Sequence, residues 1–500
     1  MAFIPSTQQS RYFGWIVNED GSCVLEAVAG SGKTTTLIEG LKLMSGDIFF
    51  GAFNKAIALE ITEKVAKLCL SNVSVSTIHA AGFAIWRKVA RNVVVDNNKC
   101  RDIFRKIAGY DKEIHKLCNA VLSLVSYAKQ AALGYDSDDI FAAIKSNTAW
   151  EQMIDHYNVD CLEREIEVIA LAKEVLLKSN MSVCELVDFD DMIYAPLINK
   201  TKCPKYDWVL IDEAQDTNAS RRALALMMLK EGGRLVAVGD RHQAIYGFTG
   251  ADSDALDIIA KEVSAIQIPL TVSYRCPKSI VTEAQQFVSH IEAHESAIEG
   301  IVSHLNDHDD ITQIAKVGDA ILCRFNAPIV ELVYKFIAAG IPAKLEGREI
   351  GNNLKALAKR WKIVTLNALE NKLSEYRDRE VKKARLKEEE GKVVAIQDKV
   401  TCMFILINRV RSINSSATIE TLCTEIDNIF ENNVDNAKVL LSTIHKSKGR
   451  EWKKVFWIQG SATWAKKDWE KQCEKNLSYV AITRSQEHLI FVPAPAKEKH

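Results

Sequence analysis

A glycine-rich segment near the start of the chain has the residue types needed to hold a chain of phosphates. It reads Ala27-Val-Ala-Gly-Ser-Gly-Lys33-Thr34, between an apolar run at Cys23–Ala27 and a helical pattern at Thr34–Met44. Its glycines let the backbone curl so that N–H groups face an anion. The Lys33 amine would reach the β- and γ-phosphates, and the Thr34 hydroxyl would bind Mg²⁺. The predicted ATP-binding residues of this loop are Ala27, Val28, Ala29, Gly30, Ser31, Gly32, Lys33, Thr34 and Thr35.

A second chemical signal is a pair of carboxylates, Asp212 and Glu213, directly after the apolar run Trp208–Ile211. Asp212 would hold the metal, directly or through water. Glu213 would orient and deprotonate the attacking water. An acidic pair after a strand is common on its own. Together with the phosphate loop it predicts a P-loop ATPase, because phosphoryl transfer needs both parts.

The elements that must position these residues follow a strand-and-helix pattern. Besides the two apolar runs above, strands are predicted at Ile48–Phe53, Val73–Ile78 and Leu235–Val238. A second set begins near Ile266, with strands at Ala320–Cys323, Val439–Ser442, Val455–Ile458 and Leu489–Val492. Strands that alternate with helices predict parallel α/β sheets.

Two long stretches interrupt this alternation. Residues 80–186 have a helical pattern without a strand signal, and the charged stretch Leu373–Lys399 predicts a solvated helix or helical hairpin. Residues 493–500 look like a frayed tail. We therefore expect an α/β fold in which each of two parallel-sheet domains is interrupted by a mainly helical insertion.

Composition sets limits on location and partners. The chain has 500 residues and a net charge of only -1, so a nucleic acid would have to bind a local groove rather than a basic tail. The 12 cysteines include no C-x-x-C pair, so reduced thiols in a cytoplasmic protein are expected. No apolar run approaches the length of a membrane span, and the start of the chain lacks the pattern of a secretory signal.

Further short motifs resemble those of superfamily 1 helicases of the UvrD/Rep/PcrA group, and they follow in that family's order. The segments that carry the resemblance are Ser76–His79, Gly239–Ala251, Ser273–Arg275, Thr443–Trp452 and Tyr479–Arg484. The Ala52–Ala56 run and the Gly239–Ala251 segment also resemble the F-box helicase branch. Thr249 stands where the family usually has arginine. The resemblance implies two RecA-like domains that bind ATP and Mg²⁺ in the cleft between them.

It also implies roles for residues that bind ATP. Gln9 (or neighbouring Gln8) would contact the adenine edge, and Tyr274 would stack on the adenine. Arg275 and Arg484 would act as arginine fingers, since cations there offset the charge of the transition state. Gln243 would sense the γ-phosphate. Glu451 would contact the ribose.

The DNA-binding residues are predicted partly from their pattern. Tyr246 and Phe248 are two apart, so in an extended segment both rings point the same way and can stack on successive bases. The alternative is that both rings belong to a core. By resemblance, DNA-backbone contacts would come from Asn54, Thr77, His79, Thr443, His445 and Lys448.

The resemblance divides the chain into residues 1–79 and 187–265 (first RecA-like domain), 80–186 (helical insertion), 266–350 and 436–492 (second RecA-like domain), 351–435 (a reduced helical insertion) and 493–500 (tail). It implies a monomeric ATP-dependent DNA helicase for single-stranded and forked or tailed DNA. Translocation would run 3′ to 5′. Replication or recombination proteins are expected partners, and repair is a further candidate pathway.

Two alternatives stay open at this point. One is a translocase that strips proteins from single strands and separates duplexes poorly, as the reduced insertion suggests. The other is a nucleotide-gated single-strand binding module without a motor. The residues for hydrolysis at positions 33, 212, 213, 243, 275 and 484 argue against the second alternative.

Overall fold

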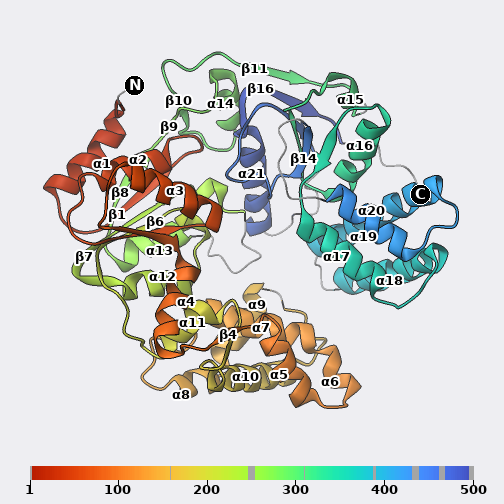
Figure 1. Cartoon of the computed structure of the whole chain (residues 1–500), viewed down its shortest axis with the longest axis horizontal. Helices are drawn as coiled ribbons and strands as arrows, with labels where there is room; N and C mark the ends of the chain where they lie inside the picture. The colour runs from red at the N-terminus through yellow and green to blue at the C-terminus, as the bar shows by residue number, and fades with distance from the viewer. Residues whose placement is uncertain are drawn as a thin grey trace. The chain divides into compact units, whose positions relative to one another are not determined.

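A computed structural model describes residues 3–157, 159–245, 254–308, 310–386, 390–430, 438–460, 465 and 468–494. The chain forms two compact units (Figure 1). The first unit comprises Met1–Val28 and Gly32–Leu270, and the second comprises Ala29–Ser31 and Thr271–His500.

The elements of the first unit are α1 (Thr7–Asn18), β1 (Cys23–Ala27), α2 (Lys33–Leu41), β2 (Ile48–Ala52), α3 (Lys55–Lys67), β3 (Val73–Thr77), α4 (Ile78–Val89), β4 (Val94–Val95), α5 (Lys99–Ala108), α6 (Lys112–Lys116), α7 (Cys118–Gln130), α8 (Ile140–Lys145), α9 (Thr148–Tyr157), α10 (Glu165–Met181), β5 (Leu186–Val187), α11 (Asp191–Ile198), β6 (Tyr206–Ile211), η1 (Ala214–Asp216), α12 (Ala219–Met227), β7 (Leu229–Gly239), η2 (Arg241–Gln243), α13 (Ala255–Glu262) and β8 (Ile266–Leu270).

The elements of the second unit are β9 (Val272–Ser273), α14 (Lys278–Ala284), β10 (Glu292–Ala293), β11 (Ile301–His304), α15 (Ile311–Ile314), β12 (Ala320–Cys323), α16 (Asn326–Ala338), β13 (Ala343–Leu345), α17 (Arg348–Lys359), α18 (Leu366–Leu386), α19 (Glu390–Ile413), α20 (Ile419–Ile429), β14 (Val439–Thr443), β15 (Trp452–Ile458), α21 (Asp468–Ile482) and β16 (Ser485–Val492).

The first unit is built on a parallel six-stranded sheet of order β3-β2-β6-β7-β1-β8. Alternate residues of its strands enter two separate cores: Leu25 of β1 packs with α1, α2 and α3, whereas Val24 packs on the face of α4, α11, α12 and α13. Figure 1 shows α1 to α3 and α12 with α13 on opposite sides of the strands. Burial on both faces explains why the strands read as continuous apolar runs.

The helices α5 to α10 have a core of their own, which includes Phe104, Leu124, Trp150 and Val175. Helix α11 joins this core to the sheet: its Tyr194 packs among the inserted helices, and its Ile193 packs under the sheet. A buried salt bridge between Lys99 of α5 and Asp191 of α11, 2.6 Å long, also crosses this junction.

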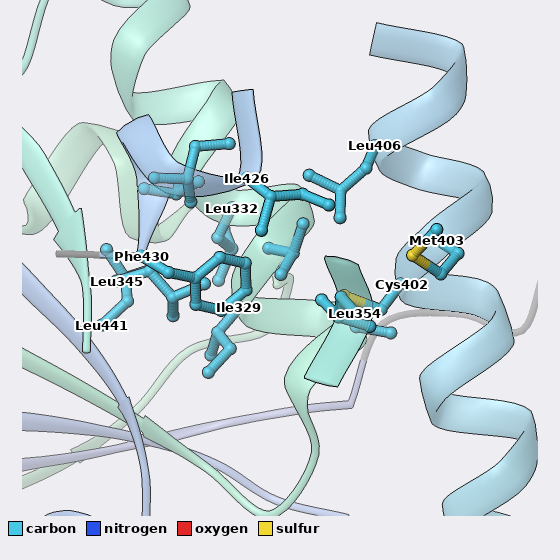
Figure 2. Close-up of a cluster of buried hydrophobic side chains, with 14 of the residues drawn as sticks. Ile329, Leu332, Leu345, Leu354, Cys402, Met403, Leu406, Ile426, Phe430 and Leu441 are labelled. Carbon is cyan, nitrogen blue, oxygen red and sulfur yellow. The ribbon is translucent and has the colours of Figure 1, made fainter. Parts of the chain in front are cut away.

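The second unit has a parallel six-stranded sheet of order β11-β16-β15-β12-β14-β13. Its core continues without a break into the helices α17 to α20. Figure 2 shows Leu345 and Leu441 of the sheet gathered with Leu354 of α17 and Leu406 of α19. The helices inserted in the second unit therefore share one hydrophobic core with the sheet.

Two parallel sheets confirm the predicted fold class, and the predicted strands are present. Most of their ends agree within a few residues, but β7 begins at Leu229 rather than at Leu235. The helical hairpin prediction is also confirmed, since α18 and α19 pack against each other through Val381, Ala384, Val393 and Ile396. The assignment of the segments to four named subdomains stays a prediction.

Two expectations about element position were wrong. The second set does not begin near Ile266, because β8 pairs with β1 as an edge strand of the first sheet. A five-residue apolar run has the same pattern whichever sheet it joins. The stretch from 80 to 186 also contains a strand, the two-residue β4, which pairs with β5 and is too short to leave a sequence signal.

Candidate nucleotide and nucleic-acid site

The phosphate loop lies between the end of β1 at Ala27 and the start of α2 at Lys33. Gly30 and Gly32 have φ angles of 74° and 77°, in the left-handed region where a side chain adds strain. The buried Ser31 hydroxyl has no hydrogen-bond partner among the residues that the structure describes. A loop with this backbone and an unsatisfied hydroxyl fits the phosphates of a nucleotide at a helix N-terminus.

The Lys33 amine is buried among carboxylates and lies 3.3 Å from Glu213 Oε1. Burial lowers the pKa of Lys33, but the nearby Glu213, Asp240 and Asp212 outweigh it and raise the pKa above the ordinary value. The lysine is therefore a fixed cation. A single cation facing three carboxylates leaves the site with excess negative charge.

Asp212 follows β6, and its backbone N–H donates to the Gly51 carbonyl of β2 at 3.0 Å. Burial and the adjacent Glu213 raise the pKa of Asp212 to about 7, although Lys33 acts in the opposite direction. The raised pKa shows that Lys33 alone does not balance the Asp212 carboxylate. Oxygen ligands of this kind fit Mg²⁺, and the Thr34 hydroxyl, in the first turn of α2, is the second predicted ligand.

Gln215, which the sequence reasoning missed, ties the catalytic residues together. Its side-chain amide donates to Glu213 Oε2, and its Oε1 accepts from the Asp240 backbone N–H at 3.0 Å. Asp240 in turn accepts from Gln243 Nε2 at 2.7 Å. The structure thus brings Lys33, Glu213 and Gln243 into one network at the carboxyl ends of β6, β7 and β1. A glutamine among acidic residues has no sequence signature of its own.

Gln9 lies beside this loop rather than on the surface. Its side-chain Oε1 accepts from the Ser6 backbone N–H, and its Nε2 donates to the Thr36 hydroxyl of α2 at 2.9 Å. The residue is only 3% exposed. Its amide therefore fixes α1 against the helix that follows the phosphate loop, and its predicted adenine contact stays a prediction.

The predicted residues of the second unit also lie together. Arg275 forms an ion pair with Glu451 and donates to the Thr483 carbonyl at 3.4 Å. The neighbouring Arg484 is 1% exposed and donates to the carbonyls of Val480 and Arg450, each at 3.1 Å. Glu451 is thus held by an arginine, and its ribose contact stays a prediction.

Tyr274 is 44% exposed, and its ring lies 4.7 Å from that of His294. An exposed aromatic ring fixed by a second ring is free to stack on a planar base on its other face. The structure supplies this stacking surface, and the adenine is the predicted occupant.

Two predicted DNA-binding residues of the first unit cap helices. Asn54 Oδ1 accepts from the Ile57 N–H at the start of α3, and the Thr77 hydroxyl accepts from the Ala80 N–H at the start of α4. Both caps lie at the carboxyl ends of neighbouring strands, β2 and β3. Helix N-termini at a sheet edge suit phosphate groups. Their contact with DNA stays a prediction.

An aromatic pair that the sequence reasoning missed extends this edge. The ring of His79 stacks on that of Phe189 at 4.1 Å and 20°, and Phe189 is 51% exposed. Burial and the nearby Arg221 lower the pKa of His79 to about 3, so the imidazole is neutral at pH 7. Phe189 lies far along the chain from His79, between two aspartates, and only the fold joins them.

In the second unit, Thr443 ends β14 and lies beside Cys323 at the end of β12. His445 follows, and burial, Arg324 and Lys448 lower its pKa to about 3. A neutral imidazole next to two cations can donate to a phosphate without carrying charge itself. The predicted residues Tyr246 and Phe248 lie outside the described residues.

Two features are absent from the described ranges. No helix there is long and apolar enough to cross a membrane. No group of three or more metal-binding side chains of the His, Cys, Asp and Glu types occurs there either. The Asp212 site is not such a group, since it combines a carboxylate with a hydroxyl.

Comparison with known proteins places this site in a family. A model described as the UvrD/REP helicase N-terminal domain matches residues 12–264, and one described as the UvrD-like helicase C-terminal domain matches residues 352–494. F-box DNA helicase protein 1 of Schizosaccharomyces pombe is 23% identical over 93% of this chain and 55% of its own length. ATP-dependent DNA helicase PcrA of Leuconostoc citreum is 25% identical over 54% of this chain and 37% of its own length.

ATP-dependent DNA helicase Rep of Escherichia coli is 24% identical over 58% of this chain and 44% of its own length. The chain thus spans about half the length of these curated relatives, or less. The N-terminal family model alone covers more than half of the chain. The chain therefore belongs to the UvrD/Rep family of helicases.

Proposed function

We propose that this protein is an ATP-driven motor that moves along single-stranded DNA and separates duplex DNA. The main support is the buried network around Lys33, which joins the phosphate loop to Glu213 and, through Gln215 and Asp240, to Gln243. This network would bind phosphates at Lys33, and it ends at Gln243. A change in the bound nucleotide can therefore reach the segment that contains Gln243. Membership of a helicase family makes DNA the substrate that the motor acts on.

Hydrolysis would use the residues in the following roles. The phosphate-loop amides and Lys33 bind and orient the triphosphate, and Glu213 accepts a proton from the attacking water. Gln215 holds the Glu213 carboxylate in one orientation. Mg²⁺, held by Asp212 and Thr34, would stabilise negative charge on the phosphate oxygens. Arg275 and Arg484 are proposed to offset the charge that develops in the transition state.

DNA would bind at the carboxyl ends of the strands, where open α/β sheets bind their ligands. In the first sheet the order β3-β2-β6-β7-β1 puts the helix caps of Asn54 and Thr77 on one flank and the phosphate loop on the other. The carboxylates Asp212 and Glu213 lie between them. A change at the nucleotide thus has a short path to the proposed DNA contacts through β6 and its neighbours.

The decisive experiment is ATP hydrolysis by the full chain with and without single-stranded DNA. We expect strong stimulation by DNA and its complete loss in Lys33→Ala. Lys42→Ala is the matched control, because Lys42 is the C-cap residue after the same helix, is 40% exposed and pairs only with Glu39 among its described neighbours. Hydrolysis that is indifferent to DNA would contradict the proposal. Tight DNA binding without hydrolysis would favour a nucleotide-gated binding module.

The direction of movement along DNA is tested separately from the result of that movement, which is either duplex separation or displacement of bound proteins. We propose 3′ to 5′ movement, so duplexes with a 3′ overhang should open, and opening only from a 5′ overhang would refute it. A translocase that strips bound proteins is the second candidate. It is favoured by the close packing of α17 to α20 into the core of the second sheet, which limits independent movement of these helices. A protein-coated strand compared with a bare forked duplex separates the two outputs.

A further inference from the structure

The first unit contains a half-buried arginine, Arg221, that is not among the predicted nucleotide or DNA contacts. It lies in the first turn of α12, where its backbone N–H donates to the side chain of the capping residue Asn218 at 3.0 Å. Its side chain turns back toward η1, and Nη1 donates to the Asp216 carbonyl at 3.0 Å. The guanidinium is thereby fixed beside η1, which follows β6 at the carboxyl end of the first sheet.

The positive charge of Arg221 is not fully balanced by the carboxylates around it. Its Nε atom is buried and has no hydrogen-bond partner within the described part of the chain. Burial lowers the pKa of Arg221, although Asp216 and Asp190 act in the opposite direction. The Asp190 carboxylate is already engaged, because it accepts from the Ser126 hydroxyl and from Gln130 Nε2. An arginine stays protonated in a protein, so the guanidinium is a fixed cation whose burial calls for a further anion.

Arg221 also lies at the part of the sheet edge where DNA is proposed to bind. It is close enough to His79 of α4 to lower the pKa of that imidazole. His79 stacks on the exposed ring of Phe189, which directly precedes Asp190 in the chain. The Thr77 hydroxyl caps the same α4 helix. The cation is therefore a neighbour of two predicted backbone contacts, Thr77 and His79.

A purely structural role accounts for only part of the guanidinium. Nη1 holds the turn at Asp216, whereas Nη2 forms no hydrogen bond with the described residues. An arginine side chain can donate five hydrogen bonds, and its planar fork matches the oxygens of a phosphate. A phosphodiester also supplies the negative charge that the site lacks, which a neutral nucleobase does not. The chemistry therefore favours a backbone phosphate over a base.

We propose that Arg221 binds one backbone phosphate of the bound single strand, next to His79. The inference rests on the proposed function, since it requires single-stranded DNA as the ligand. It adds a full positive charge to this edge of the sheet, where the caps at Asn54 and Thr77 and the neutral imidazole supply only dipoles. Such a contact positions the strand without reading its sequence, and salt weakens it.

The test measures the affinity of the full chain for an oligothymidylate by fluorescence anisotropy at several KCl concentrations. Each phosphate that a cation neutralises contributes about 0.7 to the slope of log affinity against log salt for single strands. Arg221→Gln should make that slope shallower by about 0.7 and weaken binding roughly fourfold at about 0.15 M salt. Arg221→Lys keeps the cation and should keep the slope. A merely structural role would change the affinity equally at every salt concentration.

Arg105→Gln is the matched control, because it removes the same charge from an exposed position of α5, where Arg105 pairs with Asp102. It should keep the affinity and the slope of the natural chain. A second measurement needs no variant: phenylglyoxal modifies arginine side chains, and a bound single strand should slow its reaction with Arg221 but not with Arg105.

Equal slopes for Arg221→Gln and the natural chain would overturn the phosphate contact while DNA-stimulated hydrolysis stays intact. Modification of Arg221 at the same rate with and without bound DNA would overturn it as well, even if Arg221→Gln does not fold. Failure of the natural chain to bind or respond to single strands would instead overturn the proposed function and the contact with it.

Discussion

The first unit buries two clusters of charged side chains that differ in balance. The junction cluster, formed by Lys99, Lys129, Asp188 and Asp191, sits between α5, α7 and the start of α11. Its ion pairs are 2.6 to 2.7 Å long, and two lysines face two carboxylates. Burial lowers the pKa of Lys129, but Asp191 and Asp188 outweigh it and raise the pKa well above the ordinary value. Lys129 therefore stays charged, whereas burial outweighs Asp191 and lowers the pKa of Lys99.

The nucleotide cluster, formed by Lys33, Asp212, Glu213 and Asp240, has one lysine for three carboxylates. Burial raises the pKa of Asp240, and burial with Glu213 raises the pKa of Asp212 to about 7. The ion pair between Lys33 and Glu213 is longer, at 3.3 Å. A divalent cation bound at Asp212 would offset part of this excess negative charge. A cluster with equal numbers of cations and carboxylates holds two parts of the fold together. A cluster with an excess of carboxylates is instead stabilised when a cation binds.

The largest effect should follow from unbalancing the junction cluster. Asp191→Ala would leave the Lys99 ammonium buried without its carboxylate, and breaking a buried pair costs about 3–5 kcal/mol. We expect a loss of that order in the free energy of unfolding, measured by urea denaturation. Hydrogen exchange should accelerate first in α5 and α7, which the cluster joins to α11.

The matched control for this loss is Asp102→Ala, in the exposed Arg105–Asp102 pair on the same α5 helix. An exposed pair contributes little, so the unfolding midpoint should stay near that of the natural chain. Similar losses for the two variants would show that the junction cluster contributes no more than a surface pair.

In the nucleotide cluster we expect the opposite effect, because removal of a carboxylate should raise the free energy of unfolding. Asp212→Asn removes one of the three crowded carboxylates and should stabilise the free protein at pH 8 by on the order of 2 kcal/mol. The pKa of Asp212 is higher in the folded chain, so the unfolded chain releases the proton first as pH rises. The natural chain therefore loses stability between about pH 4 and about pH 7, and the gain in Asp212→Asn shrinks toward the acid end of that window.

ATP hydrolysis should be lost in Asp212→Asn, because the amide is a poor Mg²⁺ ligand. Thermal unfolding and hydrolysis assays on the same preparation separate the two effects. A variant that is both less stable and inactive would contradict the unbalanced-cluster interpretation. Asn and Asp have nearly the same shape, so packing is not disturbed.

The two clusters also show where sequence reasoning succeeds. Gly30, Lys33 and Asp212 were identified because each follows a short buried strand, and local pattern fixes both the strand and the turn after it. The same local logic placed β1 and β12 at their observed bounds. Where chemistry and backbone conformation are set by neighbours in the chain, the pattern is sufficient.

The junction cluster shows where prediction from the sequence fails. Lys99 and Asp191 are 92 positions apart, and each sits in a polar segment that looks like solvated surface. Only the tertiary fold, in which α5 and α11 both pack against α7, buries them. Gln215 and Phe189 were missed for the same reason, since their partners Asp240 and His79 lie in distant segments of the chain, after β7 and in α4. Contacts between distant segments depend on the tertiary fold, which residue types alone do not specify.

A smaller effect is expected on the pH dependence of the affinity for a Mg²⁺–nucleotide, which would bind at the nucleotide cluster. Below about pH 7 Asp212 is protonated in the free chain, so binding of a Mg²⁺–nucleotide must release that proton. Affinity should fall by up to about tenfold for each pH unit below 7 and level off above it. Titration of a fluorescent ATP analogue between about pH 6 and about pH 8 measures this. Asp212→Asn supplies the baseline for protons on the nucleotide itself, and equal pH slopes in the two chains would argue against the raised pKa.

The smallest effect is expected when the junction cluster is reduced but kept in balance. Lys99→Met with Asp191→Asn removes one cation and one anion and leaves Lys129 paired with Asp188 at 2.6 Å. The asparagine oxygen can still accept from the Asp188 N–H, which Asp191 does at 3.1 Å. Removing both partners of a buried pair is often nearly neutral, so the double variant should unfold within about 1 kcal/mol of the natural chain. If it unfolds as easily as Asp191→Ala, the ion pair itself stabilises the junction. If it recovers, balance is what matters, and the three-to-one excess around Lys33 then marks a site shaped for a ligand rather than for stability.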